Sequence, residues 1–138
     1  TLQSVSFSLE LCSEAPGYQE NWPSDITFCV NDHPVITYTS PGDFGARRGR
    51  LTPPSWPTGR TQYGLLKSIT VSQNGTYLDG ALVNKDVTLN TLDISSHSYI
   101  SLKISIESDA ANIGGINIFG KKYGDYDQGI IMNLIYQN

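Results

Sequence analysis

Hydrophobic and polar residues alternate along most of this sequence, and this period of two restricts the fold more than any other feature. Residues 3–12 and 25–30 carry apolar side chains at every second position, which is the spacing of a strand with one buried face. The same pattern marks further strands at 35–39, 68–72, 76–78, 87–89, 99–107, 116–119 and 130–136. About nine short strands predict an all-β chain, an antiparallel two-sheet β-sandwich of jelly-roll-like type.

Length and charge narrow the class of protein. The 138 residues suit one domain, residues 1–138, with a single core. The net charge of −4 argues against a chain that grips nucleic acid by neutralising phosphates. No apolar run approaches the ~20 residues of a membrane span, and the first residues lack the pattern of a secretory leader. We therefore expect a cytoplasmic protein with no membrane contact, and a piece of a longer or processed chain because it lacks an initiator Met.

A long segment, residues 40–66, interrupts the rhythm of strands. It holds four of the seven prolines and five glycines, and a loop of this length is usually functional or disordered. Three aromatic residues in it, Phe44, Trp56 and Tyr63, provide anchors that a disordered segment lacks. We therefore predict an ordered, lid-like loop that packs over one sheet.

Three arginines in this loop form the sharpest polar cluster of the sequence. Arg47, Arg48 and Arg50 lie in a basic stretch, residues 47–78, that contains no acid, whereas residues 1–46 contain six acids and no Lys or Arg. Guanidinium groups bind carboxylates and phosphates through paired hydrogen bonds. The cluster is a candidate site for an anionic ligand; the alternative is that the arginines pair with the acidic first third and tie the loop to the body.

Aromatic residues in the loops could form a platform for a ligand. Trp22 and Trp56 each precede a proline, and with Tyr63 they could stack on a sugar ring while neighbouring polar groups bind its hydroxyls. The alternative is that the tryptophans anchor loops in the core. The predicted ligand-binding set is Arg47, Arg48, Arg50, Trp56, Trp22 and Tyr63.

No residue set in the sequence indicates catalysis or a bound metal. His33 and His97 lie outside any nucleophile or metal-ligand pattern, and we read them as surface residues. Asp125 and Asp127 only faintly resemble a calcium loop, so we expect a turn with solvated carboxylates. We therefore expect no enzyme activity, no cofactor and no metal.

Two further features leave alternatives open. Cys12 and Cys29 would point away from the core faces of their strands; we expect free thiols, and a disulfide between them would indicate a secreted protein. The last strand, 130–136, is apolar on both faces, so we expect it to be central in a sheet or covered by another part of the chain, a second subunit or a neighbouring domain.

Four segments of the sequence together resemble a known family. They are residues 9–32, 39–57, 61–67 and 112–136, in which the GARRGR, GGINIFG and GDYDQ stretches are distinctive. These segments are similar to the C-terminal domain of a family of predicted bacterial transcriptional regulators, where an ArsR-like winged helix-turn-helix precedes a β-rich part. The resemblance implies a sensing or oligomerising domain, with DNA bound only through an upstream domain that is absent from this sequence.

Three functions follow as hypotheses. The first is an effector domain that binds a small sugar-like or anionic molecule at the residue 40–66 loop and regulates transcription in the parent protein. The second is a structural domain that forms a homodimer or recruits another protein through the last strand. The third, a carbohydrate-binding β-sandwich module of an extracellular protein, shares the fold but would fit a Cys12–Cys29 disulfide.

Overall fold

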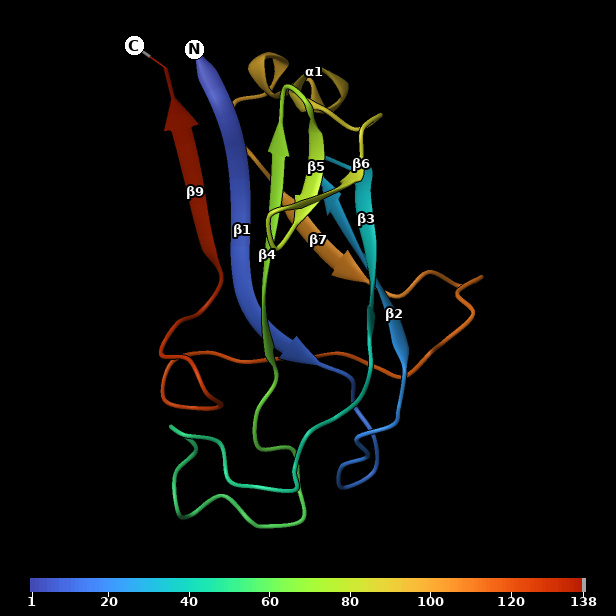
Figure 1. Cartoon of the computed structure of the whole chain (residues 1–138), viewed down its shortest axis with the longest axis vertical. Helices are drawn as coiled ribbons and strands as arrows, with labels where there is room; N and C mark the ends of the chain where they lie inside the picture. The colour runs from blue at the N-terminus through green and yellow to red at the C-terminus, as the bar shows by residue number, and fades with distance from the viewer. Residues whose placement is uncertain (138) are drawn as a thin grey trace.

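The computed structural model describes residues 1–137 and places two antiparallel sheets face to face (Figure 1). The strands are β1 (Leu2–Cys12), β2 (Ser24–Val30), β3 (His33–Ser40), β4 (Leu65–Ser72), β5 (Gly75–Leu78), β6 (Ala81–Asn84), β7 (Leu102–Ser105), β8 (Asn117–Ile118) and β9 (Ile131–Tyr136). The helical segments are α1 (Leu89–Leu92) and η1 (Ile94–Ser96). The prediction of an antiparallel two-sheet sandwich with about nine strands is confirmed.

Strand β1 organises the larger sheet. That sheet runs β6-β5-β4-β1, and β4 pairs with β1 along Ser4–Leu11. Two strands share the other edge of β1: β9 pairs with its first half and β8 with its last two residues. The smaller sheet has only three strands, in the order β3-β2-β7. The larger sheet therefore has six strands but is five strands wide, against three for the smaller sheet.

The core forms where the apolar faces of the two sheets meet. The alternating residues of β1 and β2 that the sequence assigned to the inside are all buried, namely Val5, Phe7, Leu9, Leu11, Ile26, Phe28 and Val30. The same cluster also contains Val35, Tyr38, Ile69, Val71, Val87 and Leu92. Burial of such side chains stabilises the fold by about 1.5–3 kcal/mol each.

A short helix replaces one predicted strand. The sequence predicts a strand at 87–89, but Thr88 caps α1, because its hydroxyl accepts a hydrogen bond from the Thr91 N–H at 3.4 Å. Three alternating residues are too few to separate a strand from a helix, and the capping interaction decides the outcome. Among the described residues, no helix has the length and apolar character needed to cross a membrane.

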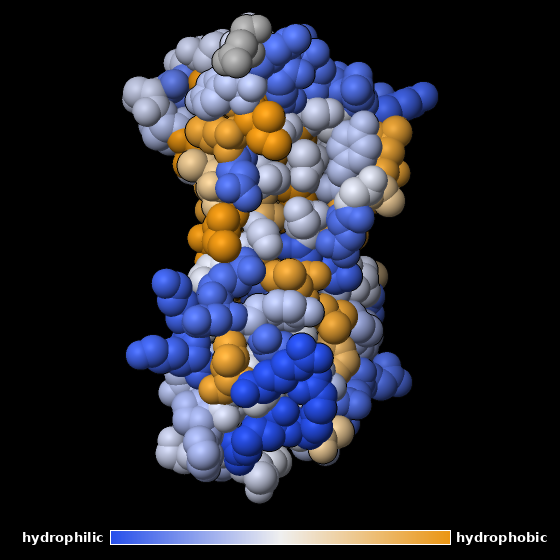
Figure 2. Space-filling model, turned by 60° about the vertical axis from the view of Figure 1, so that its left-hand side comes forward, coloured by the Kyte–Doolittle hydropathy of each residue, from blue (hydrophilic) through white to orange (hydrophobic). Residues whose placement is uncertain are grey.

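Strand β9 lies at the edge of the larger sheet, so the first of the two predicted alternatives, a central strand, is wrong, and cover by a second subunit or a neighbouring domain stays a prediction. Its only strand partner within residues 1–137 is β1. Every residue of β9 is exposed, although residues 94–100 lie across a hollow from Met132. Figure 2 shows apolar side chains gathered along this edge of the molecule.

Three loops meet at the end of the sandwich where β1 ends and β2 begins (Figure 1). They are residues 13–23, 41–64 and 119–130. Backbone hydrogen bonds join them, including Asp43 N–H to the Gln19 carbonyl at 2.7 Å and Leu51 N–H to the Gly124 carbonyl at 2.8 Å. The long loop is thus well anchored, but it extends beyond the end of the sandwich instead of lying over a sheet face as predicted.

Both cysteines are free, as the sequence predicts, and both are also buried, which it did not predict. Burial, and after it the negative charge of Asp43, raise the pKa of the Cys12 thiol to about 12. Burial also raises the pKa of Cys29. A thiol whose pKa lies well above the ambient pH is protonated and reacts slowly.

We predict that neither cysteine reacts in the folded protein. Near pH 8, an alkylating thiol reagent should modify both cysteines at least about a hundredfold more slowly in the native protein than in denaturant. Mass spectrometry after timed quenching measures the two rates. Rapid labelling of Cys12 in the native protein would contradict the burial that the fold gives it.

Candidate functional site

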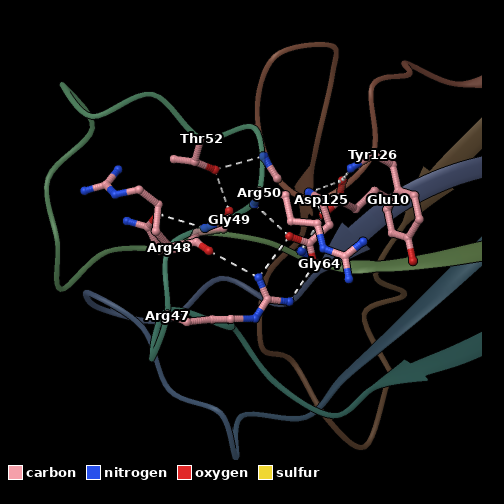
Figure 3. A network of polar contacts seen from close by, with 11 residues as sticks. Glu10, Arg47, Arg48, Gly49, Arg50, Thr52, Gly64, Asp125 and Tyr126 are labelled. Atoms are coloured by element: carbon pink, nitrogen blue, oxygen red, sulfur yellow. Dashed lines mark hydrogen bonds and ion pairs between the residues drawn. The ribbon is translucent and has the colours of Figure 1, made fainter.

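A buried carboxylate, that of Glu10, lies where two of the three loops meet the sheet. Glu10 is fully buried although it occupies the face of β1 opposite to Leu9 and Leu11. Its oxygens accept hydrogen bonds from the backbone N–H groups of Gly64 at 2.8 Å, Asp125 at 2.9 Å and Tyr126 at 3.1 Å (Figure 3). One side chain therefore fixes the positions of the residue 41–64 and residue 119–130 loops relative to β1.

A glycine makes this arrangement possible. Gly124 has a φ of 76°, and a Cβ built on it would lie 2.5 Å from both carboxylate oxygens of Glu10. Residues other than glycine rarely adopt this backbone conformation. The chain reverses at this position so that the next two N–H groups point at the carboxylate.

Arg47 and Asp125 link the same two loops on their exposed side. The guanidinium donates two hydrogen bonds to the carboxylate, at 3.0 and 2.6 Å, and the Arg50 N–H adds a third at 3.0 Å (Figure 3). Burial raises the pKa of Asp125, but hydrogen bonds and positive charge from Arg47 and Arg50 outweigh burial, so the net pKa is below the usual 3.8. Asp125 is therefore a paired carboxylate, and the prediction of a solvated turn at this residue is wrong.

The sequence predicts that the arginines pair with acids of the body; Arg47 does pair with an acid, but not with one from the predicted region. Arg47 ties the loop to the body through Asp125 in the last third of the chain, not through the acidic first third. Arg48 donates to the backbone carbonyls of Pro53 at 2.7 Å and Trp56 at 3.0 Å. Its side chain thus closes a turn within the long loop.

Tyr63 extends the Arg47 interaction into a stack of three groups. The guanidinium carbon of Arg47 lies 3.7 Å from the centre of the Tyr63 ring. The other partner of Tyr63 is Phe44, at 5.4 Å between ring centres. Cation–π contacts of this kind fix the guanidinium plane, so both the Asp125 carboxylate and the Tyr63 ring hold Arg47.

The two tryptophans do not form a common platform. Trp56 donates from Nε1 to the Thr61 carbonyl at 2.8 Å and contacts Tyr123 edge-on, whereas Trp22 donates to the Gly114 carbonyl at 3.1 Å. Their exposed fractions are 38% and 37%. Each ring therefore anchors its own loop while one part stays accessible.

A small hollow lies beside the arginines. Its volume is about 220 Å³, and its lining comprises Tyr18, Gly45, Ala46, Arg47, Arg48, Thr58, Gly59 and Gln62. Of the predicted ligand-binding set, Arg47 and Arg48 line this hollow. Arg50, Trp22, Trp56 and Tyr63 do not, although Tyr63 and Trp56 contact the arginines that do.

The sequence analysis missed both buried acids. Asp43 is fully buried and accepts hydrogen bonds from the Ala15 N–H at 2.9 Å and the Thr61 hydroxyl at 2.6 Å. It joins the residue 13–23 loop to the long loop, as Glu10 joins the others. One feature of the sequence could have identified Glu10: it lies inside a predicted strand, close to long loops. An acid that such loops cover needs several hydrogen-bond donors, so it would join the loops to the strand.

A larger hollow lies elsewhere, beside the two ends of the chain. It has a volume of about 420 Å³ and is lined by Thr1, Leu2, Gln73, Leu89, Asn90, Asp93, Ile94, Ser95 and Tyr136. It holds one charged side chain, that of Asp93, and no residue of the predicted ligand-binding set. Its groups offer little specific recognition for an anion.

Histidines and metal ligands do not add a reactive centre to this site. His97 is exposed and packs edge-on against Tyr99, and the His33 ring interacts with the Pro34 carbonyl. In the part of the chain that the structure describes, no three His, Cys, Asp or Glu residues are grouped as a metal site requires. No family model, curated protein or solved structure matches this chain.

We predict that Glu10 is among the most important residues for stability. Glu10→Gln replaces one accepting oxygen with an N–H₂ group that faces backbone donors, so the free energy of unfolding should fall by about 3 kcal/mol. Urea denaturation measures the change. Glu14→Gln is the matched control because Glu14 is exposed, and it should change stability by less than about 0.5 kcal/mol. Equal effects of the two substitutions would contradict the role of Glu10.

We predict that the Arg47–Asp125 pair loses its contribution in acid. Because the pKa of Asp125 is lowered in the folded state, its stabilisation is present above the unfolded pKa and disappears as the pH falls below about 3.8. Asp125→Asn should cost about 1–2 kcal/mol near pH 7 and much less near pH 3. Urea denaturation at both pH values measures this, with Asp127→Asn as the exposed control. A cost for Asp125→Asn that does not change with pH would contradict the pairing.

Proposed function

We propose that this chain is a non-catalytic sensing and self-association domain of a transcriptional regulator, which binds a small anionic or sugar-like molecule in the hollow beside Arg47. The observation that carries this proposal is that Arg47 belongs both to the hollow and to an ion pair. Its side chain lines the hollow and also forms the ion pair with Asp125. A bound anion and the loop that carries Asp125 would therefore compete for one guanidinium.

The chemistry of the hollow sets the class of ligand. Its volume of about 220 Å³ is below the ~300–1,000 Å³ of sites for drug-sized ligands, so it suits one small acid or one sugar unit. Arg47 and Arg48 supply positive charge and Tyr18 an aromatic wall. A carboxylate or phosphate on the ligand would accept the two parallel hydrogen bonds that Arg47 now donates to Asp125.

Competition for Arg47 provides a path for a signal. A ligand shifts a conformational equilibrium only when it binds the two states with different affinity. Release of Asp125 would loosen the residue 119–130 loop, which leads directly into β9. In this proposal, ligand binding alters the edge of the larger sheet.

The family resemblance supports the regulatory context. In that reading the winged helix lies outside this sequence, DNA binding belongs to it, and the parent protein is cytoplasmic. The charge of the present chain, −4, agrees with a domain that does not itself bind DNA. The free cysteines favour this proposal over an extracellular carbohydrate-binding module.

We predict that small acids stabilise the protein through Arg47. A thermal-shift screen of sugars, sugar acids, phosphorylated sugars and nucleotides should give at least one acidic compound that raises the Tm by about 2–5 °C at millimolar concentration, because ligand binding to the native state adds stability. The shift should be lost in Arg47→Ala, measured against that variant's own Tm. It should persist in Arg60→Ala, which removes an exposed arginine outside the hollow.

Three results would distinguish the alternatives. An equal shift in Arg47→Ala would place the ligand elsewhere and contradict the proposed site. A shift with neutral sugars alone would support the carbohydrate-binding module. No shift with any compound would remove the sensing half of the proposal and leave self-association.

A further inference from the structure

Strand β9 exposes apolar side chains on both faces of a sheet edge. Ile130, the residue before the strand, is 47% exposed, and the five apolar residues within it are between 36% and 63% exposed. They are Ile131, Met132, Leu134, Ile135 and Tyr136. Figure 2 shows this apolar strip at the surface.

The unequal width of the two sheets explains the exposure of the inner face. Met132 and Leu134 pair with Phe7 and Val5, whose side chains face the core. Beyond β1, however, the three-stranded sheet ends at β7, and within the described chain residues 94–100 reach Met132 only across an open hollow. The inner face of β9 therefore overhangs the edge of the core.

The outer face is apolar where its neighbour is polar. Ile131 and Ile135 pair with Ser8 and Ser4 on β1. An isolated sheet face exposed to water would be expected to continue the serine pattern. Exposure of these isoleucines to water is unfavourable in free energy unless a partner covers them.

The edge also lacks two of the features that keep sheet edges apart, charge and proline, and the one irregularity of its ladder with β1 lies between Leu2 and Ser4. Natural edge strands carry lysines, prolines or bulges that prevent pairing with another chain. Residues 130–137 contain no charged residue and no proline. By contrast, β7 and β3, the edges of the smaller sheet, contain Lys103 and Pro34.

We propose that β9 pairs antiparallel with β9 of a second copy of this chain, around a two-fold axis that passes beside Asn133. The order of residues around Asn133 is the reason. In a two-fold antiparallel pair, residues equally spaced from the centre face each other on the same side of the sheet. With Asn133 at the centre, Met132 meets Leu134, Ile131 meets Ile135 and Ile130 meets Tyr136 of the other copy.

This register pairs apolar residues with apolar residues on both faces. The one polar side chain, Asn133, meets its own copy, and an amide can both donate and accept a hydrogen bond. A centre at Met132 or Leu134 would instead set Asn133 against an isoleucine. The sequence of the strand thus selects one register.

Charge and area agree with a second copy as the occupant. Two copies of an uncharged strand do not repel each other when they pair. A charged partner would find no opposite charge on this strand to form an ion pair. Edge-to-edge pairing of two such short strands buries a small area, at the low end of the range for specific interfaces. The expected product is one continuous sheet across two subunits, held in a reversible dimer.

The other edge of the larger sheet does not show these properties. Strand β6 exposes Leu82 and Val83, but it has only four residues and no apolar sequence that reads alike in both directions. Lys85 and Asp86 follow it directly. Leu82 therefore provides a matched control with an exposed fraction, 53%, close to the 57% of Ile135.

Sedimentation equilibrium of the full chain tests the interface. The wild type and Leu82→Lys should have about twice the 15.1 kDa mass of one chain at high concentration, and Ile135→Lys should have the mass of one chain, because it sets an ammonium against Ile131 of the other copy. Circular dichroism checks that the variants fold. A monomeric wild type, or an Ile135→Lys variant that stays dimeric, would overturn the proposal.

Cysteine cross-linking tests the register without relying on a disruptive substitution. Asn133→Cys should form a disulfide-linked dimer under mild oxidation, since the two positions face each other. Ile135→Cys should not, because its two copies would lie several residues apart along the strands, beyond the reach of a disulfide. Cys12 and Cys29 are buried and do not compete. Equal cross-linking of both variants, or cross-linking of neither, would overturn the Asn133-centred pairing.

This inference deepens the self-association half of the proposed function, on which it rests for its biological role. The two tests fail separately. A ligand screen without a hit leaves the cross-linking result intact, and a monomeric chain leaves the ligand site intact. If both succeed, the acidic ligand should change the dimer's dissociation constant, since the residue 119–130 loop joins the two sites.

Discussion

The carboxylate of Glu10 is the interaction on which the loop end of this protein depends. Its two oxygens accept hydrogen bonds from backbone donors of two loops that lie far apart in the sequence. A strand can carry such a residue on its outer face only because those loops cover it. The Arg47–Asp125 pair then adds a second link between the same loops, nearer to the surface. The 41–64 loop is long and rich in glycine and proline, yet these two links give it a defined position.

The residue 119–130 loop connects the polar contacts at the loop end of the sandwich to the exposed edge strand. At its centre, Gly124 allows the close approach to Glu10, and Asp125 binds Arg47. A few residues later the same segment becomes β9, the exposed edge strand. A ligand that competes for Arg47 would act on this loop first and on the strand next. The proposed sensing site and the proposed dimer edge are therefore neighbours along the chain, although different residues form them.

Much of the sandwich could be predicted from the sequence because a period of two identifies buried strand faces directly, as in β1 and β2. The 87–89 segment could not, since three residues of alternation carry too little information and the Thr88 cap decides its conformation. The position of β9 was also beyond the pattern: apolar residues on both faces indicate that a strand is covered, but they do not say by what. In the site, Arg47 was found from its residue type, whereas its partner Asp125 depends on how distant loops fold together. Glu10 and Asp43 were missed because burial of an acid depends on donors that only the tertiary structure brings.

Native-state hydrogen exchange of individual backbone amides tests this account most directly. The N–H groups of Gly64, Asp125 and Tyr126 lie outside the strands, yet each donates to the buried carboxylate of Glu10. The account predicts that they exchange as slowly as the amides of β1, near the free energy of global unfolding. Fast exchange of these three amides, at the rate of an exposed loop, would contradict it, because the loops would then open without the fold and Glu10 would not hold them.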